Sequence, residues 1–469
     1  MSPRDRSQRN RQPADLLIEG GTVIAMDAER RIYDPGTISI RQGRVVEIGP
    51  CGSLPGSAKE RIDATNMVVM PGLLNAHSHL TPSVYRSCFD EKPDSRDAWL
   101  RMARGLTRQR ARQATALTLL EQVRYGTTTT HESHMTHYHP DSTDGICEAI
   151  QQSGMRAVVA RSMNDKAEYT AVEFLERYQD ALDDLDRLER EWESDLIRII
   201  PEAATVLRCT PEAVLAMREW AIKRDKIWHI HLAQNNAELR EALRTVGMGS
   251  VQYAAQLGVL GPEMLAAHCS GLLEDEVELL GERQVRIAHC PVPMMRGGQM
   301  VPPIWELERL GARVAIATDG SSTNNGQNLW EAMKMAVYMQ RVRSADRHLG
   351  TAEQALEMAT IKAARVLDLE QKVGSLEPGK EADIAMFRRD QPHLATDAML
   401  VSNLVYAGGN NLADTVLVGG RVILQRGRST VLDEEEVLAG AREAQREMLR
   451  EAGLEGEIGL TSSWPVIIA

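Results

Sequence analysis

Short apolar runs alternate with longer amphipathic segments through the middle of the chain, from about residue 71 to residue 370. The runs include MRAVVAR, LIRIIPEA, IWHIHLA, MLAAHC, VRIAHCP and RVAIATDG, and stretches such as AVEFLERYQDALDDLDRLEREWE separate them. Apolar runs of about four to eight residues between helical patterns are typical of parallel strands joined by crossover helices. The number of repeats, close to eight, predicts an α/β fold in which residues 71–370 form a (β/α)8 TIM-like barrel.

The two ends of the chain have a different residue pattern from the middle. β-Branched runs separated by glycine pairs occur in DLLIEGGTVIAM and GTISIRQGRVVEIGP, and they return in GSLEPGKEADIAMFR and DTVLVGGRVILQRGR. Such runs predict antiparallel strands, so we expect residues 14–70 and 371–430 to pair into one small composite β-sandwich domain. Residues 1–13 are predicted to be a disordered polar tail. Residues 431–469 are predicted to be an exposed helix and tail with i,i+4 charge pairs.

The composition excludes several classes of partner. A net charge of −12 and a pI near 5.6 argue against a nucleic-acid or anionic-membrane surface, because both need a clustered basic face. No apolar stretch of about eighteen residues is present, and the polar N-terminus lacks the apolar region of a secretory signal. The cysteines have no CxxC spacing and are expected to be reduced. These features predict a cytoplasmic protein that acts on a small molecule.

Histidine and aspartate follow several of the apolar runs. His77 and His79 lie in VVMPGLLNAHSHL, and His231, His268 and Asp319 follow later runs. Residues at i and i+2 of a strand share one face, and reactive groups of such barrels collect at the C-terminal strand ends. Imidazole and carboxylate suit zinc and its first-row neighbours, and an open metal position lowers the pKa of bound water to about 7. The sequence therefore predicts a metal-dependent hydrolase.

Asp319 can serve twice in such a site, as a ligand and as the base that orients or deprotonates the water. The run LIRIIPEA contains no lysine that could form a carbamate bridge between two ions. We therefore predict a single ion, and Glu202 in that run is the residue that could overturn this prediction.

The segments PGLLNAHSHL, HIHLAQNNAE, AAHC and IATDGSSTNN, in this order, resemble the amidohydrolase superfamily from about residue 15 to residue 430. Within it the chain looks most like the branch of thioadenosine and guanine-type deaminases, triazine hydrolases, and phenylurea and thiocarbamate hydrolases. The resemblance implies one divalent ion per subunit, zinc by default, with cobalt, iron or manganese as alternatives. It implies metal ligation by His77, His79, His231 and Asp319, and a contact of His268 with the substrate or the attacking water. It also implies a homo-oligomer.

One position departs from the pattern of the deaminases in this branch. They carry a glutamate that shuttles a proton three residues after the histidine of the fifth strand, and here that residue is Gln234. An amide has no proton to exchange near neutral pH, but it can donate and accept hydrogen bonds. We therefore expect Gln234 and His268 to orient a carbonyl or stabilise its oxyanion.

This reasoning predicts cleavage of a C–N or C–S bond at a carbamoyl-type carbon. The substrate would be a small neutral urea, carbamate or thiocarbamate such as a herbicide, which implies a role in xenobiotic degradation. Phenylurea and molinate hydrolases are then the nearest members by resemblance. An aminohydrolase or dechlorinase of a purine-like or s-triazine ring is the alternative, with Glu132, Glu202 or Glu238 as the acid. A third hypothesis is a catalytically inactive binding protein.

Four residues are candidates for substrate contacts: His134, His289, Met294 and Trp99. Each histidine could equally be a packed core residue, and Met294, with its neighbours, could line an apolar cavity or pack against a helix. Trp99, or else Tyr85, could stack on a ring.

Other histidines are given no catalytic role. His229 shares a face with His231 one layer deeper, so we expect it to pack or to support a ligand. His131, His137 and His139 are expected to be ordinary loop residues, with adventitious metal binding by this cluster as the alternative.

Overall fold

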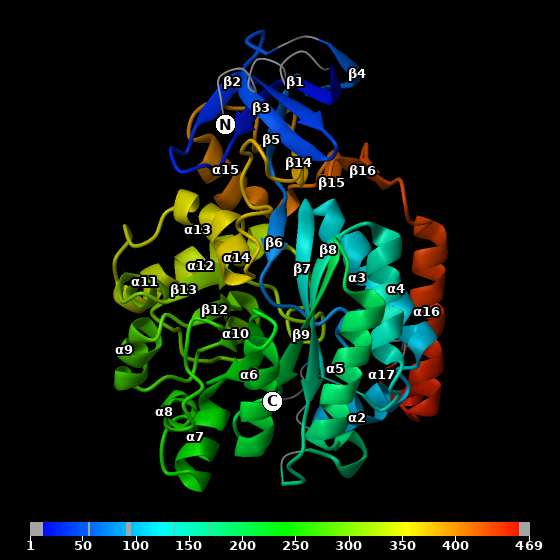
Figure 1. The fold of residues 1–469 in the computed structure, drawn as a ribbon, viewed down its shortest axis with the longest axis vertical. Coiled ribbons are helices and arrows are strands. Elements are labelled where there is room, and N and C mark those ends of the chain that lie inside the picture. Colours follow the sequence, from blue (N-terminus) through cyan, green and yellow to red (C-terminus); the bar gives the residue numbers. More distant parts are fainter. Residues whose placement is uncertain (1–12, 55–56, 91–94, 136, 169, 459–469) are drawn as a thin grey trace.

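Eight parallel strands form a barrel in the structure, a computed structural model that describes residues 13–54, 57–90, 95–135, 137–168 and 170–458 (Figure 1). The strands lie side by side in chain order. They are β6 (Leu73–Asn75), β7 (Thr127–His134), β8 (Arg156–Met163), β9 (Ile197–Ala203), β10 (Trp228–Leu232), β11 (Met264–His268), β12 (Arg286–His289) and β13 (Arg313–Ile316). The barrel nearly closes, because the backbone N–H of Ala76 reaches the carbonyl of Ile316 at 3.4 Å.

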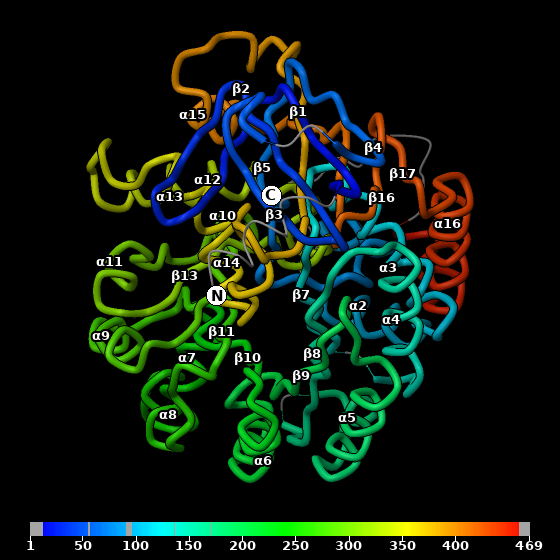
Figure 2. The backbone as a smooth tube through the Cα atoms, turned by 45° about the horizontal axis from the view of Figure 1, so that its top comes forward, coloured from blue at the N-terminus to red at the C-terminus, as the bar shows by residue number. Residues whose placement is uncertain are grey.

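Helices lie outside the strands, as Figure 2 shows for α5 to α9. They are α3 (Arg108–Arg124), α4 (Ser142–Ser153), α5 (Tyr178–Trp192), α6 (Pro211–Ile222), α7 (Asn236–Thr245), α8 (Ser250–Gln256), α9 (Glu274–Glu282), α10 (Pro291–Arg296), α11 (Ile304–Arg309), α12 (Leu329–Ser344), α13 (Ala352–Met358) and α14 (Ile361–Val366). The loop after β6 holds η1 (Thr81–Tyr85) and α2 (Ser95–Arg104), and the loop after β8 holds η2 (Val172–Phe174). Since the strands are covered on both faces, every residue of β8 is buried, which explains the continuous apolar runs.

Strand β7 is the exception to this apolar rule. Its sequence is TTTTHESH, and all of its residues are buried. The expectation that His131 is a loop residue is therefore wrong. The β-branched side chains of threonine favour a strand, but a polar run gives no apolar signal from which its burial could be recognised.

The second domain is a sheet of nine strands from both ends of the chain, drawn at the top of Figure 1. Its strands are β1 (Ala14–Ile24), β2 (Ile32–Arg41), β3 (Arg44–Pro50), β4 (Ala58–Asp63), β5 (Met67–Pro71), β14 (Ile384–Arg388), β15 (Thr415–Val418), β16 (Arg421–Gln425) and β17 (Arg428–Ser429). Strand β5 pairs antiparallel with β14, and this pairing joins the two ends of the chain. The barrel with an attached sheet domain is thus confirmed.

Helix α15 (Leu400–Tyr406) and the turn η3 (Gly408–Asn410) connect β14 to β15, and α16 (Glu434–Glu451) and α17 (Glu455–Ile458) follow the sheet. Helix α16 packs along α3, so it is not simply an exposed helix (Figure 1). The disordered tail expected for residues 1–13 lies, apart from Pro13, outside the described residues, as does the chain after Ile458. None of the described helices is long and apolar enough to cross a membrane.

Candidate active site

The predicted metal ligands meet at one end of the barrel. His77 and His79 follow β6, His231 lies in β10, and Asp319 follows β13. The Nε2 atoms of His77 and His79 lie 3.9 and 3.3 Å from Asp319 Oδ1. One potential ligand atom from each of these three residues lies within 4.8 Å of the others, and the same holds for His77, His231 and His268. The two groups share His77, which therefore stands between them.

The chemistry of these residues fits a divalent metal ion. Both ring nitrogens of His77 are buried and have no hydrogen-bond partner among the described residues. Burial, followed by the neighbouring histidines, holds the pKa of His77 well below its usual range, so this imidazole is neutral and offers the lone pair of one ring nitrogen. An unpaired buried polar group costs about 1–3 kcal/mol. A metal ion that prefers imidazole and carboxylate, such as zinc, would remove this cost.

Polar neighbours fix the orientation of two ligands. His79 Nδ1 donates to the carbonyl oxygen of Ser133 at 2.6 Å, which leaves Nε2 facing Asp319. His231 Nδ1 lies 3.3 Å from Glu202 Oε1. Such contacts set the tautomer and the ring orientation of histidine ligands in metal sites.

Glu202, in β9, supports two histidines with its two oxygens. Oε2 lies 3.1 Å from His229 Nδ1, while Oε1 is near His231 and also accepts from Ser133 Oγ at 2.9 Å. Burial acts to raise the pKa of Glu202, but His229 and His231 hold it well below its usual range. Glu202 is therefore an anion that positions His231, and it is not suited to supply a proton.

The backbone at two site residues is held in an uncommon conformation. His268 has a φ of 76° and Asp319 a φ of 62°, in the left-handed region that favours glycine. The backbone N–H of Asp319 donates to the carbonyl of His77 at 3.0 Å, which holds this turn against β6. Non-glycine residues in this region persist where the surrounding structure fixes them, often at functional sites.

Gln234 lies beside His268, with 3.4 Å between their Nε2 atoms. Glu238 is occupied nearby, because its oxygens accept from the backbone N–H groups of Ala233 and Gln234 at 3.1 and 2.8 Å and from Ser250 Oγ at 2.7 Å. Glu238 therefore stabilises the loop that carries Gln234 and is not a free acid.

A cavity of about 170 Å³ opens beside these residues. Its lining includes His79, His134, His231, Gln234, Asp319 and Trp99. An adjoining depression is lined by His268, Met294, Gln234 and Asp319 among others.

The two remaining candidate histidines differ in their access to this space. His134 lines the cavity, lies 2.8 Å from Ser142 Oγ through Nε2, and has a pKa lowered to about 3 by burial. His289 in β12 is fully buried, lines neither space, and has a pKa lowered to about 4 by burial. A direct substrate contact is thus compatible with the position of His134 and not with that of His289.

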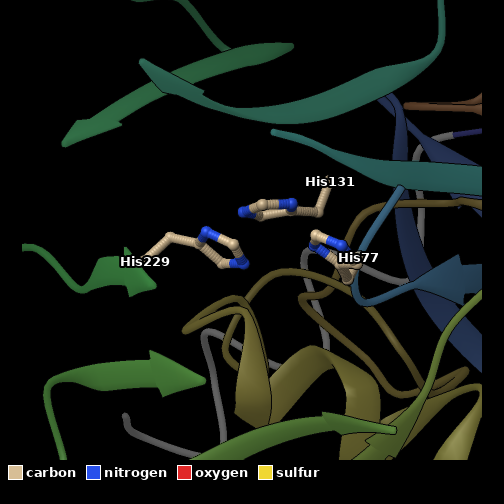
Figure 3. Close-up of side chains that lie close together, drawn as sticks. All are labelled: His77, His131 and His229. Carbon is tan, nitrogen blue, oxygen red and sulfur yellow. The ribbon is translucent and has the colours of Figure 1, made fainter. Parts of the chain in front are cut away.

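The imidazoles of His131 and His229 gather beside that of His77 inside the barrel (Figure 3). The ring centroids of His131 and His229 are 4.5 Å apart, and those of His77 and His229 are 5.0 Å apart. His229 Nδ1 lies 3.1 Å from Glu202 Oε2, and the other five ring nitrogens have no hydrogen-bond partner among the described residues. His131 and Ser133 share one face of β7, and this alternation is the sequence signal that could have placed His131 inside the barrel.

Arg208 also lines the cavity and was not predicted from the sequence. It lies in the loop between β9 and α6, a position typical of functional residues in such barrels. Arg208 lies beyond the apolar run LIRIIPEA, so the sequence pattern does not indicate that it lines the cavity.

Comparisons with known proteins agree with this geometry. The model of the amidohydrolase family matches residues 68–423. A 5-methylthioadenosine/S-adenosylhomocysteine deaminase of Pelotomaculum thermopropionicum is 32% identical over 93% of this chain and 99% of its own length.

Two solved structures share the fold. One is an adenosine deaminase from Xanthomonas campestris with bound zinc (TM-score 0.87, 23% identity, 94% of this chain and 99% of that chain). The other is atrazine chlorohydrolase from Arthrobacter aurescens TC1 with zinc (TM-score 0.84, 24% identity, 92% and 100%). The broad resemblance seen in the sequence is confirmed, whereas the narrower one to phenylurea and molinate hydrolases is not supported.

Proposed function

Because the chain belongs to the amidohydrolase family, we propose that this metal-dependent hydrolase of C–N bonds removes ammonia from a purine-like heterocycle. The convergence of His77, His79, His231 and Asp319 beside a cavity carries the hydrolytic part of the proposal. The deaminase of Pelotomaculum thermopropionicum, which is 32% identical over 93% of the chain, supports deamination over cleavage of a carbamoyl group.

A bound divalent ion, zinc by default, would supply Lewis acidity and lower the pKa of water at the site. The residues of the chain supply the rest. His77, His79, His231 and Asp319 would hold the ion. Asp319, which lines the cavity, would accept a proton from water as the water attacks the ring carbon.

The leaving amine needs a proton, and Gln234 has none to give. The three carboxylates proposed from the sequence as alternative acids are poorly placed to donate this proton. Glu202 is an anion beside His229 and His231, and Glu238 accepts hydrogen bonds from the loop that carries Gln234. Burial raises the pKa of Glu132 to about 8, but its Oε2 accepts from the backbone N–H of Leu80 at 2.5 Å, and it does not line the cavity. We therefore assign the return of the proton to Asp319, so that water is consumed and ammonia and the oxo-heterocycle are released.

The cavity suits a flat ring. Trp99 and Tyr85 both line it and provide aromatic surface, and hydroxyl groups of Thr81, Thr205 and Thr323 offer hydrogen bonds. A largely apolar lining with a few polar groups is the usual composition of a small-molecule site.

Ammonia release from a panel of purines, purine nucleosides and s-triazines, measured on metal-analysed protein, tests the proposal. We expect the wild-type protein to release ammonia from at least one purine-type substrate. The His231→Ala variant should lose both this activity and the bound metal. The exposed His348→Ala is the matched control and should retain both. Metal-free protein that keeps full turnover would refute the metal-dependent mechanism, and metal-loaded protein that releases ammonia from no heterocycle would refute deamination.

Hydrolysis at a carbamoyl-type carbon is the second candidate, and the Gln234–His268 contact favours it. Two hydrogen-bonding side chains without a carboxylic acid suit a substrate whose leaving group needs little protonation. Ureas, carbamates and thiocarbamates in the same panel, followed by amine or thiol release, distinguish the two reactions.

A further inference from the structure

The backbone of Asp319 has a conformation that is uncommon for residues other than glycine. Its φ of 62° lies in the left-handed region, which a side chain disfavours. A residue stays in this region only where its surroundings hold the chain there. The groups that hold the backbone of Asp319 therefore decide where its carboxylate points, both as a candidate metal ligand and as the base of the proposed reaction.

A glutamine of the same loop, Gln327, holds the carbonyl group of Asp319. Its Nε2 donates to that carbonyl oxygen at 2.9 Å and lies 3.3 Å from Ser321 Oγ. Its Oε1 accepts from Thr318 Oγ1 at 2.8 Å and from Nε2 of Gln122, in α3, at 2.9 Å. The carboxamide thus has partners for its nitrogen and for its oxygen, and these partners fix its orientation.

The N–H side of the same turn is held by β6, the strand beside which the barrel closes. The backbone N–H of Asp319 donates to the carbonyl oxygen of His77 at 3.0 Å. Asn75 contacts Thr318 twice, because its Oδ1 accepts from the backbone N–H of Thr318 at 3.0 Å and its Nδ2 donates to Thr318 Oγ1 at 2.6 Å. The turn is therefore fixed on both sides of Asp319.

Gln327 acts from outside the space in which a substrate would bind. Its side chain is fully buried, and it lines neither the cavity beside the candidate ligands nor the adjoining depression. Burial of a carboxamide is costly, and an apolar side chain could fill the same space without that cost. The hydrogen bond to the carbonyl of Asp319 gives the glutamine a role that an apolar side chain cannot fill.

We propose that Gln327 is a positioning residue that acts through Asp319. It holds the left-handed turn, so that the carboxylate of Asp319 keeps its place near the Nε2 atoms of His77 and His79. A displacement of about 1 Å at a reacting group can cost about 100-fold in rate. Position 327 should therefore affect both metal affinity and kcat. These effects rest on the proposed function, the first on ligation by Asp319 and the second on deamination.

Gln327→Met tests this role, because methionine fills a similar volume and offers no strong hydrogen bond. Metal affinity is measured by competition with a chelator of known affinity. The values of kcat and KM are measured by ammonia release from the best heterocycle, at saturating metal. We expect metal affinity to fall about 10- to 100-fold and kcat to fall about 10- to 100-fold, with KM changed by less than about twofold.

Gln340→Met is the matched control for the loss of a buried glutamine. Gln340, in α12, is also buried and lines neither space, and it donates to the carbonyl of Pro302 at 2.7 Å. Both variants should lose thermal stability, whereas only Gln327→Met should lose metal affinity and kcat. The double variant Gln122→Met/Gln327→Met removes the amide that the single variant leaves unpaired. It should fold more readily and show the same losses of metal affinity and kcat.

Two results would overturn the positioning role of Gln327. One is wild-type metal affinity and kcat in Gln327→Met or in the double variant. The other is an equal fall in Gln340→Met, because the losses would then follow from general destabilisation. If metal affinity falls as expected but the metal-loaded wild type releases ammonia from no heterocycle, the proposed deamination is wrong and the positioning of Asp319 by Gln327 stands.

Discussion

The side-chain nitrogens of Gln234 and His268 lie 3.4 Å apart at the edge of the cavity. Burial lowers the pKa of His268 to about 3, so its imidazole is neutral near pH 7, and neither residue of the pair carries a transferable acidic proton there. Both line the same depression as Asp319. Proton transfer at this site therefore depends on the single carboxylate of Asp319.

Gln234→Glu should raise the deaminase activity. A carboxyl group at this position would give a second group that can deliver a proton to the leaving amine, and such a group typically contributes about 10²–10⁴ in rate. We expect kcat for ammonia release to rise by at least about tenfold, with a new acidic limb in the pH profile. Gln234→Ala should lower kcat instead, because it removes the hydrogen bonds without adding an acid. Equal kcat values for the wild type and the glutamate variant would contradict this role of position 234.

Glu202→Gln should weaken metal binding without removing a ligand. Glu202 Oε1 faces His231 Nδ1, and loss of such an orienting carboxylate typically costs about 10- to 100-fold in metal affinity. Competition with a chelator of known affinity measures this change directly. Glu282→Gln, on the exposed end of α9, is the matched control. If Glu202→Gln binds metal as tightly as the wild type, Glu202 does not position His231.

The stability of the metal-free protein should depend on the protonation of buried histidines. Burial lowers the pKa of His289 to about 4, below the value near 6.5 of an unfolded chain. Between these values the unfolded state binds the proton and the folded state does not, so the contribution of His289 falls as the pH falls from about 6.5 to 4. Its slope is about 1.4 kcal/mol per pH unit. Glu132, with a pKa raised to about 8, acts with the opposite sign, so the wild-type slope is a sum.

His289→Asn isolates the histidine contribution, because the other groups are unchanged. Urea unfolding of both proteins at pH 6.5, 5.5 and 4.5 should show a shallower loss of stability in the variant, by about 1.4 kcal/mol per pH unit. Parallel curves for the two proteins would mean that His289 is protonated equally in the folded and unfolded states.

The sequence predicts features that depend on short-range pattern. The barrel follows from the apolar runs, and the ligand segments follow from histidines and Asp319 at their ends. The burial of His131 was not predicted because β7 is rich in threonine. The role of Glu202 was not predicted because it depends on the register in which β9 pairs with β10, which sets Glu202 beside His229. The place of Arg208 was not predicted because it depends on the path of the loop between β9 and α6, which brings this side chain to the cavity.

The packing of helix α16 is another feature that the sequence pattern does not reveal, and it bears on the shape of the cavity. The sequence suggests an exposed helix, yet α16 buries Ala444 and Met448 against the barrel. Arg110 of α3 holds it through Glu447 at 2.9 Å and Glu451 at 2.6 Å. Farther along, Gln445 donates to the carbonyl of Val84 at 2.9 Å, within η1, which lines the cavity through neighbouring residues.

Arg110→Ala should therefore loosen α16 and, through it, the wall of the cavity. The carboxylates of Glu447 and Glu451 are partly exposed, so we expect a loss of about 1–3 kcal/mol in the free energy of unfolding, as for a hydrogen-bonded charged group. Because η1 carries Tyr85, KM should rise more than kcat falls. Urea unfolding and steady-state kinetics measure the two effects, with Arg112→Ala on the same helix as the control. A destabilised variant with unchanged KM would show that α16 stabilises the fold without shaping the cavity.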